Sequence, residues 1–196
     1  GTAMDYARYG ALAMDLNAHG MLNDQPKEYY DALWEGELNK YAAREPADKE
    51  NYYFKWMFLR ALRAVDYLTN DPLWDGKHIV VVGGSQGGAQ SAFLAAIDPR
   101  VTAAVLQVPA MLDQGGSLQK RAVAWPKTMN KYKESTLANS PYFDPALLLC
   151  NTNAEIWCEI GLYDMTCPAP NIYAALNTGK TPVTIVTYQR GHVLNG

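Results

Sequence analysis

Ser85 is the residue of this sequence best suited to act as a nucleophile. It lies in the run G-G-S-Q-G-G, where Gly83, Ser85 and Gly87 form a G-x-S-x-G pattern. This pattern is typical of a sharp strand-to-helix turn in which the serine backbone is strained and its Oγ is exposed. Glycines two residues before and after the serine let the chain segments approach each other. The backbone N–H of Gln86 would then point at a developing oxyanion, near the positive end of the helix.

The segments on either side of the turn support this interpretation. A short apolar strand over residues 78–82 precedes the turn, and a helix of small residues over 89–97 follows it. A Gly-rich turn can also serve only helix–strand packing, or bind phosphate. The run has neither the Lys-Ser/Thr of a P-loop nor the G-x-G-x-x-G spacing of a dinucleotide-binding turn. The pattern therefore favours a nucleophilic serine.

A serine at its ordinary pKa is a poor nucleophile and needs a base, which a carboxylate in turn orients. In hydrolases built on this turn, the chain order is serine, acid, histidine. His19 and His78 precede Ser85, so His192, in the run R-G-H, is the only eligible base. His78 starts a strand at the opposite end of the sheet and is interpreted as structural, whereas His19 lies in a loop that can approach the site.

The acid must lie between Ser85 and His192 in the chain. Asp164 directly follows the predicted strand C-E-I-G-L-Y and precedes Pro168, which places it at the same edge of the sheet as the serine. Asp113 also follows a strand and is the competing acid. Asp144 lies in an aromatic loop, where we expect it to cap a helix that begins at Pro145.

The elements that must position these residues alternate between helix and strand. This alternation predicts one α/β layer domain over residues 1–196, with a mainly parallel sheet covered by helices on both faces. Strands are predicted at residues 11–16, 78–82, 101–108, 155–162 and 183–188. Residues 5–9 are predicted to be the end of one helix, and further helices are predicted at residues 26–43, 48–68, 89–97 and 168–176.

The stretch over residues 114–149 is interpreted as loop-rich and aromatic, with Trp125, Tyr132, Tyr142 and Phe143. Trp125 and Tyr142 are candidates for the wall of a substrate pocket, because aromatic faces pack well against sugar rings. Tyr53 and Trp56 follow helical spacing, which favours a place in the core or an interface over a role in binding.

Composition excludes several classes of protein. The chain has 196 residues, of which 48% are hydrophobic, enough for one sizeable core. Its 17 Lys and Arg residues are scattered among 20 Asp and Glu residues, which argues against a nucleic-acid partner. No apolar run reaches the length of about 18 residues that a membrane span needs. No signal peptide is evident, but the sequence starts at Gly1 rather than Met, so an upstream signal and the compartment stay open.

The cysteines and histidines do not suggest a resident metal. The three cysteines, Cys150, Cys158 and Cys167, form no C-x-x-C pair and are interpreted as reduced and structural. Three histidines in the whole chain argue against a multi-His metal site. We therefore expect neither a metal nor a cofactor.

The motifs around these residues resemble those of the acetyl xylan esterase and cephalosporin-C deacetylase family of α/β-hydrolases. The matching runs are G-G-S-Q-G-G, D-P-R-V-T-A-A-V, S-P-Y-F-D, G-L-Y-D-M-T-C-P, G-H and, upstream, A-R-Y-G-A-L-A-M-D-L-N-A-H-G. They span nearly the whole chain and keep its order. The resemblance implies a three-layer fold, with Ser85 as nucleophile, Asp164 as acid and His192 as base.

The resemblance also implies further features of the site and the substrate. The Gln86 N–H would be one oxyanion donor, and small acyl groups, mainly acetyl, would be removed from sugar hydroxyls and similar alcohols. Cys167-Pro168 matches a structural Cys-Pro position. A homo-oligomer that admits only small substrates is a further implication. The alternatives are another hydrolase of this fold, such as a dienelactone-type hydrolase or a peptidase, and a non-catalytic α/β domain.

The family's domain is longer than this sequence. Its first strands and the loop with the second oxyanion donor would lie before Gly1, and a closing helix would lie after Gly196. The strand expected between residues 11–16 and 78–82 would also be missing, which would leave unpaired backbone groups along both. We therefore expect a partial domain with impaired catalysis, because one lost oxyanion donor costs roughly 10² to 10³ in rate.

Overall fold

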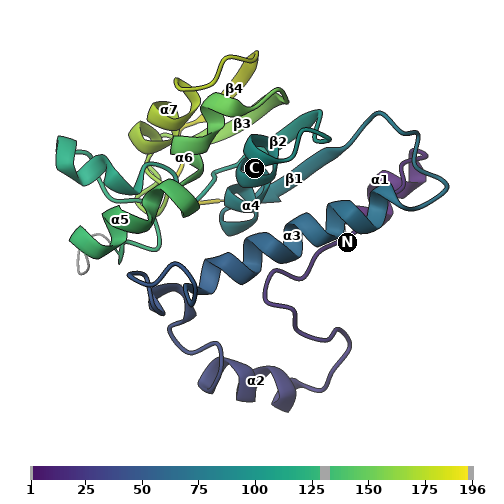
Figure 1. Ribbon diagram of the computed structural model, residues 1–196, viewed down its shortest axis with the longest axis horizontal. Helices are drawn as coiled ribbons and strands as arrows, with labels where there is room; N and C mark the ends of the chain where they lie inside the picture. The colour runs from purple at the N-terminus through teal and green to yellow at the C-terminus, as the bar shows by residue number, and fades with distance from the viewer. Residues whose placement is uncertain (1, 129–132, 194–196) are drawn as a thin grey trace.

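The computed structural model describes residues 2–128 and 133–193 (Figure 1). Their centre is a four-stranded parallel sheet in the order β1-β2-β3-β4. The strands are β1 (Val80–Gly84), β2 (Ala103–Gln107), β3 (Glu155–Gly161) and β4 (Val183–Tyr188). All of them run in one direction, so their carboxyl ends meet at one edge, where ligands bind in open α/β sheets. The predicted parallel α/β architecture is confirmed.

Two crossover helices connect neighbouring strands over one face of the sheet. Helix α4 (Gln86–Ile97) links β1 to β2, and α7 (Ala169–Leu176) links β3 to β4. Small residues let α4 lie close to the sheet, and nine of its residues are buried. Buried residues of both helices belong to one apolar cluster with the inward residues of β2 and β3, namely Ala104, Leu106, Ile156, Cys158 and Ile160.

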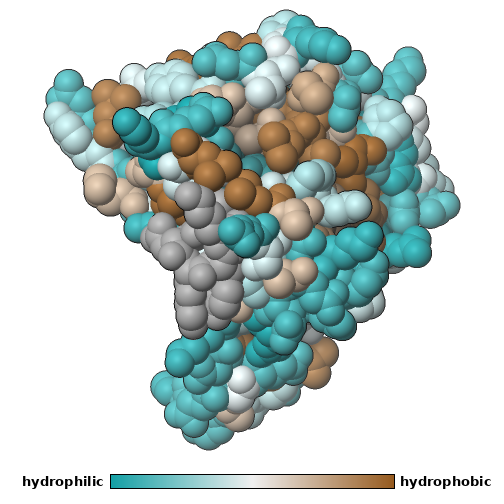
Figure 2. Space-filling view, turned by 60° about the vertical axis from the view of Figure 1, so that its left-hand side comes forward, coloured by the Kyte–Doolittle hydropathy of each residue, from teal (hydrophilic) through white to brown (hydrophobic). Residues whose placement is uncertain are grey.

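The opposite face of the sheet is largely exposed in the described residues. Alternate strand positions point to it, and Val80, Val82 and Trp157 keep 58%, 36% and 44% of their surface accessible. The expected cover of helices on this second face is therefore not seen among residues 2–128 and 133–193. Apolar patches of the molecular surface are set among hydrophilic residues in Figure 2.

Helix α3 (Tyr53–Thr69) packs against α4 and supports the turn at Ser85 from outside. The predicted apolar face is buried at Phe54, Met57, Phe58, Ala61 and Val65. Phe58 stacks on Phe93 of α4, with ring centroids 4.0 Å apart. The helix begins five residues later than predicted, because Asp48 instead accepts hydrogen bonds from the N–H groups of Glu50 and Asn51 in a preceding turn.

The chain before α3 departs most from the sequence prediction. Helix α1 (Thr2–Arg8) agrees with the helix end expected there, but residues 11–16 form no strand. A strand needs a ladder partner, and no described strand lies beside this segment, so Leu12, Met14 and Leu16 stay exposed. Helix α2 (Lys27–Glu35) starts directly after Pro26 but ends at Glu35, capped by Gly36, instead of continuing to residue 43. It lies across α3 from the sheet (Figure 1), and a short 3-10 helix, η1 (Tyr41–Ala43), leads back to the core.

The region predicted as loop-rich contains several short helices. They are η2 (Gln114–Gln119), α5 (Lys133–Phe143), α6 (Pro145–Leu148) and η4 (Leu149–Asn151). The sequence does not predict α5, because this helix has no apolar repeat and contains Pro141. Tyr132 lies outside the described residues. Within the part of the chain that the structure describes, no helix is long and apolar enough to cross a bilayer.

Candidate active site

Ser85 occupies the turn between β1 and α4 with an unusual backbone conformation. Its φ of 51° and ψ of −115° lie in a region that L-residues rarely adopt. Three backbone hydrogen bonds hold it there: Ser85 N donates to Gln107 O, and Ser85 O accepts from Ala89 N and Ala110 N. The predicted strained turn is therefore present, and neighbouring strands and helix lock it in place.

The two glycines of the pattern differ in what they do. A Cβ on Gly83 would lie 2.2 Å from the carbonyl oxygen of Gly87, so the close approach requires a glycine at 83. A Cβ on Gly87 would meet nothing within 4 Å, so the expectation that packing excludes a side chain there is wrong. The second tight position is Gly88, whose Cβ would lie 2.9 Å from the Cα of Pro109.

Ser85, His192 and Asp164 form one hydrogen-bonded chain. His192 Nε2 lies 2.8 Å from Ser85 Oγ, and His192 Nδ1 lies 2.7 Å from Asp164 Oδ2. An ionised carboxylate only accepts, so the proton sits on Nδ1 and the Nε2 lone pair faces the serine hydroxyl. The imidazole side chain is 26% exposed, whereas that of Asp164 is fully buried. This order of contacts allows Nε2 to take a proton from Oγ.

The Asp164 carboxylate is held by its own turn. It directly follows β3, and its Oδ1 accepts hydrogen bonds of 2.8 Å from the backbone N–H groups of Thr166 and Cys167. Its Oδ2 is then free to orient His192. Burial of a carboxylate is unfavourable unless such partners replace water, and here three donors do so.

Gln86 connects the turn to the elements packed outside it. Its backbone N–H opens the first turn of α4, where N–H groups have no partner within the helix. Tyr41 donates from its hydroxyl to Gln86 Oε1 at 2.6 Å, and Gln86 Nε2 donates to Met57 Sδ. Burial, followed by the neighbouring Tyr53, raises the pKa of Tyr41 to about 12, so this hydroxyl keeps its proton.

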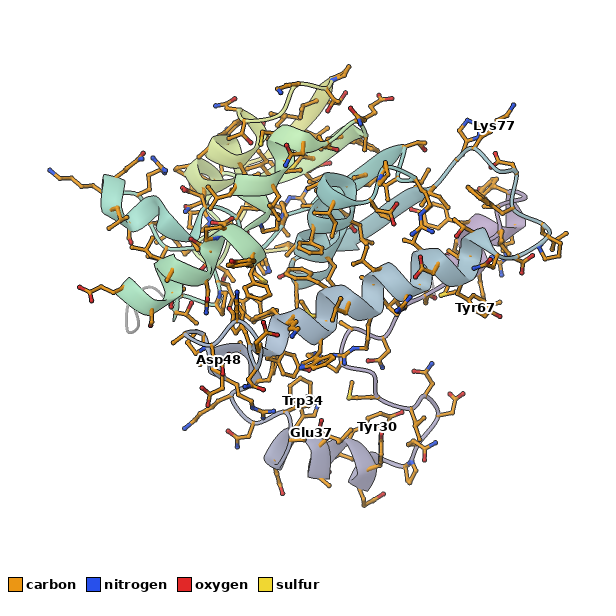
Figure 3. All side chains as sticks on the ribbon, in the orientation of Figure 1. Tyr30, Trp34, Glu37, Asp48, Tyr67 and Lys77 are labelled. Atoms are coloured by element: carbon orange, nitrogen blue, oxygen red, sulfur yellow. The ribbon has the colours of Figure 1, made fainter. Side chains whose placement is uncertain are left out.

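Tyr41 is the centre of an aromatic cluster that the sequence pattern did not reveal. Its ring contacts His19 at 4.7 Å and Tyr53 at 4.8 Å between centroids, with Trp125 at 6.3 Å. Trp34 joins the cluster from α2 and lies between that helix and the start of α3 (Figure 3). Trp125 thus lies in an aromatic wall connected to Gln86, whereas Tyr142 is half-exposed with Lys49 over its ring. Tyr53 is buried as expected, but Trp56 is exposed.

The rival acids have other partners. Asp113 pairs with Arg121 Nε at 2.7 Å, whereas His192 is held by Asp164. Asp144 accepts from Ala146 N and caps α6, as predicted. Burial raises the pKa of Asp144 to about 7.

The other two histidines also lie apart from Ser85 and Asp164. His78 pairs with Asp75 at 2.5 Å on the surface before β1. His19 Nδ1 lies 2.7 Å from the Tyr53 hydroxyl, and burial, followed by Arg60, lowers its pKa. His19 therefore belongs to the aromatic wall, not to the chain of proton-transfer groups.

The cysteines are unpaired, and two of them are buried. Cys150 is partly exposed within η4, and Cys158 lies within the sheet. Cys167 has an unexpected neighbour, because its thiol is within hydrogen-bonding reach of the Ser85 hydroxyl. Burial, followed by the charge of Asp164, raises the pKa of the Cys167 thiol to about 12.

The family model described as acetyl xylan esterase (AXE1) matches residues 2–193, nearly the whole chain. The chain belongs to the acetyl xylan esterase family. Among individual relatives, the acetyl esterase Axe7A of Xylanibacter ruminicola is 35% identical over 184 residues. That match covers 90% of this chain and 42% of the relative, so the chain spans less than half the relative's length.

Solved acetyl xylan esterases share the fold. The enzyme from Paenibacillus sp. R4 has a TM-score of 0.71 at 24% identity, over 95% of this chain and 58% of the other. Acetyl xylan esterase 1 from Thermoanaerobacterium sp. JW/SL YS485 has a TM-score of 0.73 at 21% identity, over 99% and 65%. The expected α/β-hydrolase fold is therefore confirmed by members of the acetyl xylan esterase family.

Proposed function

We propose that this chain carries the catalytic triad of a serine ester hydrolase, Ser85, His192 and Asp164, and removes small acyl groups, mainly acetyl, from carbohydrate hydroxyls. The observation that carries the proposal is the continuous contact from Ser85 Oγ through His192 to the buried Asp164. Membership of the acetyl xylan esterase family supports the acetyl ester as the substrate class.

The proposed reaction has two stages. His192 Nε2 takes the proton of Ser85 Oγ while Oγ attacks the ester carbonyl, and the Gln86 N–H donates to the resulting oxyanion. The imidazolium then protonates the leaving sugar oxygen, which leaves an acetyl group on Ser85. A water molecule, deprotonated by His192, attacks this acetyl-enzyme, and acetate leaves as Oγ regains its proton.

The aromatic wall beside Gln86 supports a sugar as the leaving group. Tyr41 and Trp125 offer aromatic surface near the turn, and such surfaces pack against the apolar faces of pyranose rings. The second oxyanion donor expected upstream, the single-domain organisation and a homo-oligomer remain predictions.

Acetate release from acetylated xylo-oligosaccharides tests the proposal. We expect turnover by this chain, and none measurable for Ser85→Ala, because removing the serine costs on the order of 10⁶ in rate. Parallel assays with butyryl esters and peptides distinguish the rivals: faster cleavage of a peptide or a long acyl chain would contradict the assignment to small acyl esters. A pre-steady-state burst with p-nitrophenyl acetate would reveal the acetyl-enzyme.

A further inference from the structure

Cys167 places a thiol beside the triad. The cysteine follows Asp164 by three residues, and its backbone N–H donates to Asp164 Oδ1 at 2.8 Å. This turn brings the thiol within hydrogen-bonding reach of the Ser85 hydroxyl. The thiol is fully buried, and the charged groups near it include Asp164.

The donor atoms around this thiol converge on a small volume. One donor atom each from Asp164, Cys167 and His192 lie within 4.8 Å of one another. Ser85 Oγ is a fourth donor, 2.8 Å from His192 Nε2. Zn²⁺ binds Cys sulfur at about 2.3 Å and His nitrogen at about 2.0 Å in tetrahedral sites, so side-chain movements that draw these donor atoms closer together would let them share one ion.

The contacts among these residues already favour a metal-binding tautomer. Asp164 accepts from Nδ1 of His192, an arrangement that fixes the ring and exposes the Nε2 lone pair in many metal sites. The His192 side chain is 26% exposed, so the imidazole is not sealed from solvent. The Asp164 carboxylate also supplies negative charge next to the cation.

We propose that Cys167 Sγ and His192 Nε2, with Asp164 held against Nδ1, form an inhibitory site for a thiophilic divalent cation such as Zn²⁺. On binding, the thiol releases its proton to solvent, and the cation bonds to the thiolate and to the Nε2 lone pair. Ser85 Oγ or a water completes the coordination. That lone pair is the group which accepts the serine proton, so the bound cation blocks nucleophilic attack. Inhibition rests on the proposed function, but cation binding does not.

Cd²⁺ titration of the catalytically inactive Ser85→Ala variant tests the site without relying on turnover. We expect a cadmium–thiolate charge-transfer absorption that saturates at one equivalent per chain. The double variant Ser85→Ala/Cys167→Ser should lose this absorption, while Ser85→Ala/Cys158→Ala, which removes another buried thiol, should retain it. Ser85→Ala/Cys150→Ala controls for the more accessible thiol. Absorption that survives Cys167→Ser, or disappears with either control, would overturn the proposal.

Zn²⁺ titration of hydrolysis tests the consequence. We expect the wild-type chain to lose activity reversibly, with recovery on adding EDTA. For Cys167→Ser, the Zn²⁺ concentration that halves the zinc-free rate should rise by about 10- to 100-fold or more, because loss of even a neighbour of a metal ligand weakens metal binding by about that factor. Equal inhibition of both proteins by Zn²⁺ would refute the site. Thermal melts of the wild-type chain and of Cys167→Ser would establish that both are folded. If the chain binds Cd²⁺ but hydrolyses no ester, the proposed function is refuted and the metal site is not.

Discussion

Gly161 and Gly191 bring two strand ends into backbone contact and so place the proposed base. A Cβ on Gly161, the last residue of β3, would lie 2.6 Å from the Gly191 carbonyl oxygen. Beside them, Leu162 N donates to Tyr188 O, and Tyr163 N donates to Arg190 O. The loop that carries His192 is thereby fastened to the turn that carries Asp164.

Gly161→Ala should therefore weaken activity more than stability. The added methyl must push the Gly191 backbone away, and a displacement of about 1 Å in a catalytic group can lower the rate about 10²-fold. Overpacking of this kind typically costs about 1–3 kcal/mol of folding free energy. Esterase assays and thermal melts measure both effects. Gly115→Ala is the control, because its Cβ would meet only Leu137 Cδ2, at an ordinary 3.6 Å; equal losses in the two variants would contradict this explanation.

Asp164→Asn should leave the fold intact and nearly abolish turnover. An amide in place of the carboxylate can donate to Nδ1, which favours the tautomer whose Nε2 carries the proton and cannot accept from Ser85. In a serine protease the corresponding change lowers kcat by about 10⁴, and we expect a similar scale here. Asp113→Asn is the control, since Asp113 pairs with Arg121. A comparable loss of kcat in that variant would favour the rival acid.

Tyr41→Phe tests whether the wall behind Gln86 positions the oxyanion donor. Without its hydroxyl, Gln86 Oε1 loses a 2.6 Å hydrogen bond. If this hydrogen bond stabilises the transition state by about 1 kcal/mol, its loss should lower kcat roughly fivefold and leave KM little changed. Tyr53→Phe removes a hydroxyl from the same cluster that contacts His19 instead. Steady-state kinetics of both should separate them, and the idea fails if the two variants lose kcat equally.

The candidate site was predictable because chain order leaves few choices. The apolar strand and the Gly-rich turn mark Ser85, only one histidine follows it, and Asp164 lies at a strand end between them. The three side chains do meet at the carboxyl edge of the sheet. Their catalytic roles remain a proposal for experiment.

Contacts between distant segments could not be predicted in this way. The hydrogen bond from Tyr41 to Gln86 joins residues 45 positions apart, and no periodicity encodes it. The spacing of Cys167 from the other cysteines predicts only a structural thiol. The turn that follows Asp164 brings this thiol close to Ser85, and cysteine spacing does not encode that turn. Residues 11–16 have an apolar composition typical of a strand, but strand formation depends on a partner ladder that composition does not reveal.

Gly83 and Gly87 should respond in opposite ways to alanine. At 83 the added Cβ would lie 2.2 Å from backbone, so we expect Gly83→Ala to misfold or melt much earlier. At 87 the Cβ meets open space within α4, and alanine is better than glycine inside a helix by up to about 1 kcal/mol. Thermal melts should show a small stabilisation for Gly87→Ala. Strong destabilisation of that variant would restore the original expectation that both glycines are required for packing.

Asp144 should make stability fall as pH rises through the weakly acidic range. Burial raises its pKa from 3.8 to about 7 in the folded chain. Between about pH 4 and pH 7 the folded state therefore binds more protons at this site than the unfolded state, so the free energy of unfolding decreases with pH. Asp144→Asn removes this titration while keeping an acceptor for the N–H of Ala146. The melting temperature of the wild type, relative to Asp144→Asn, should drop steadily from pH 4 to pH 7 and level off above it. If the difference in melting temperature between the two proteins stays constant over this range, Asp144 keeps an ordinary pKa. In that case the backbone N–H donors lower its pKa as much as burial raises it.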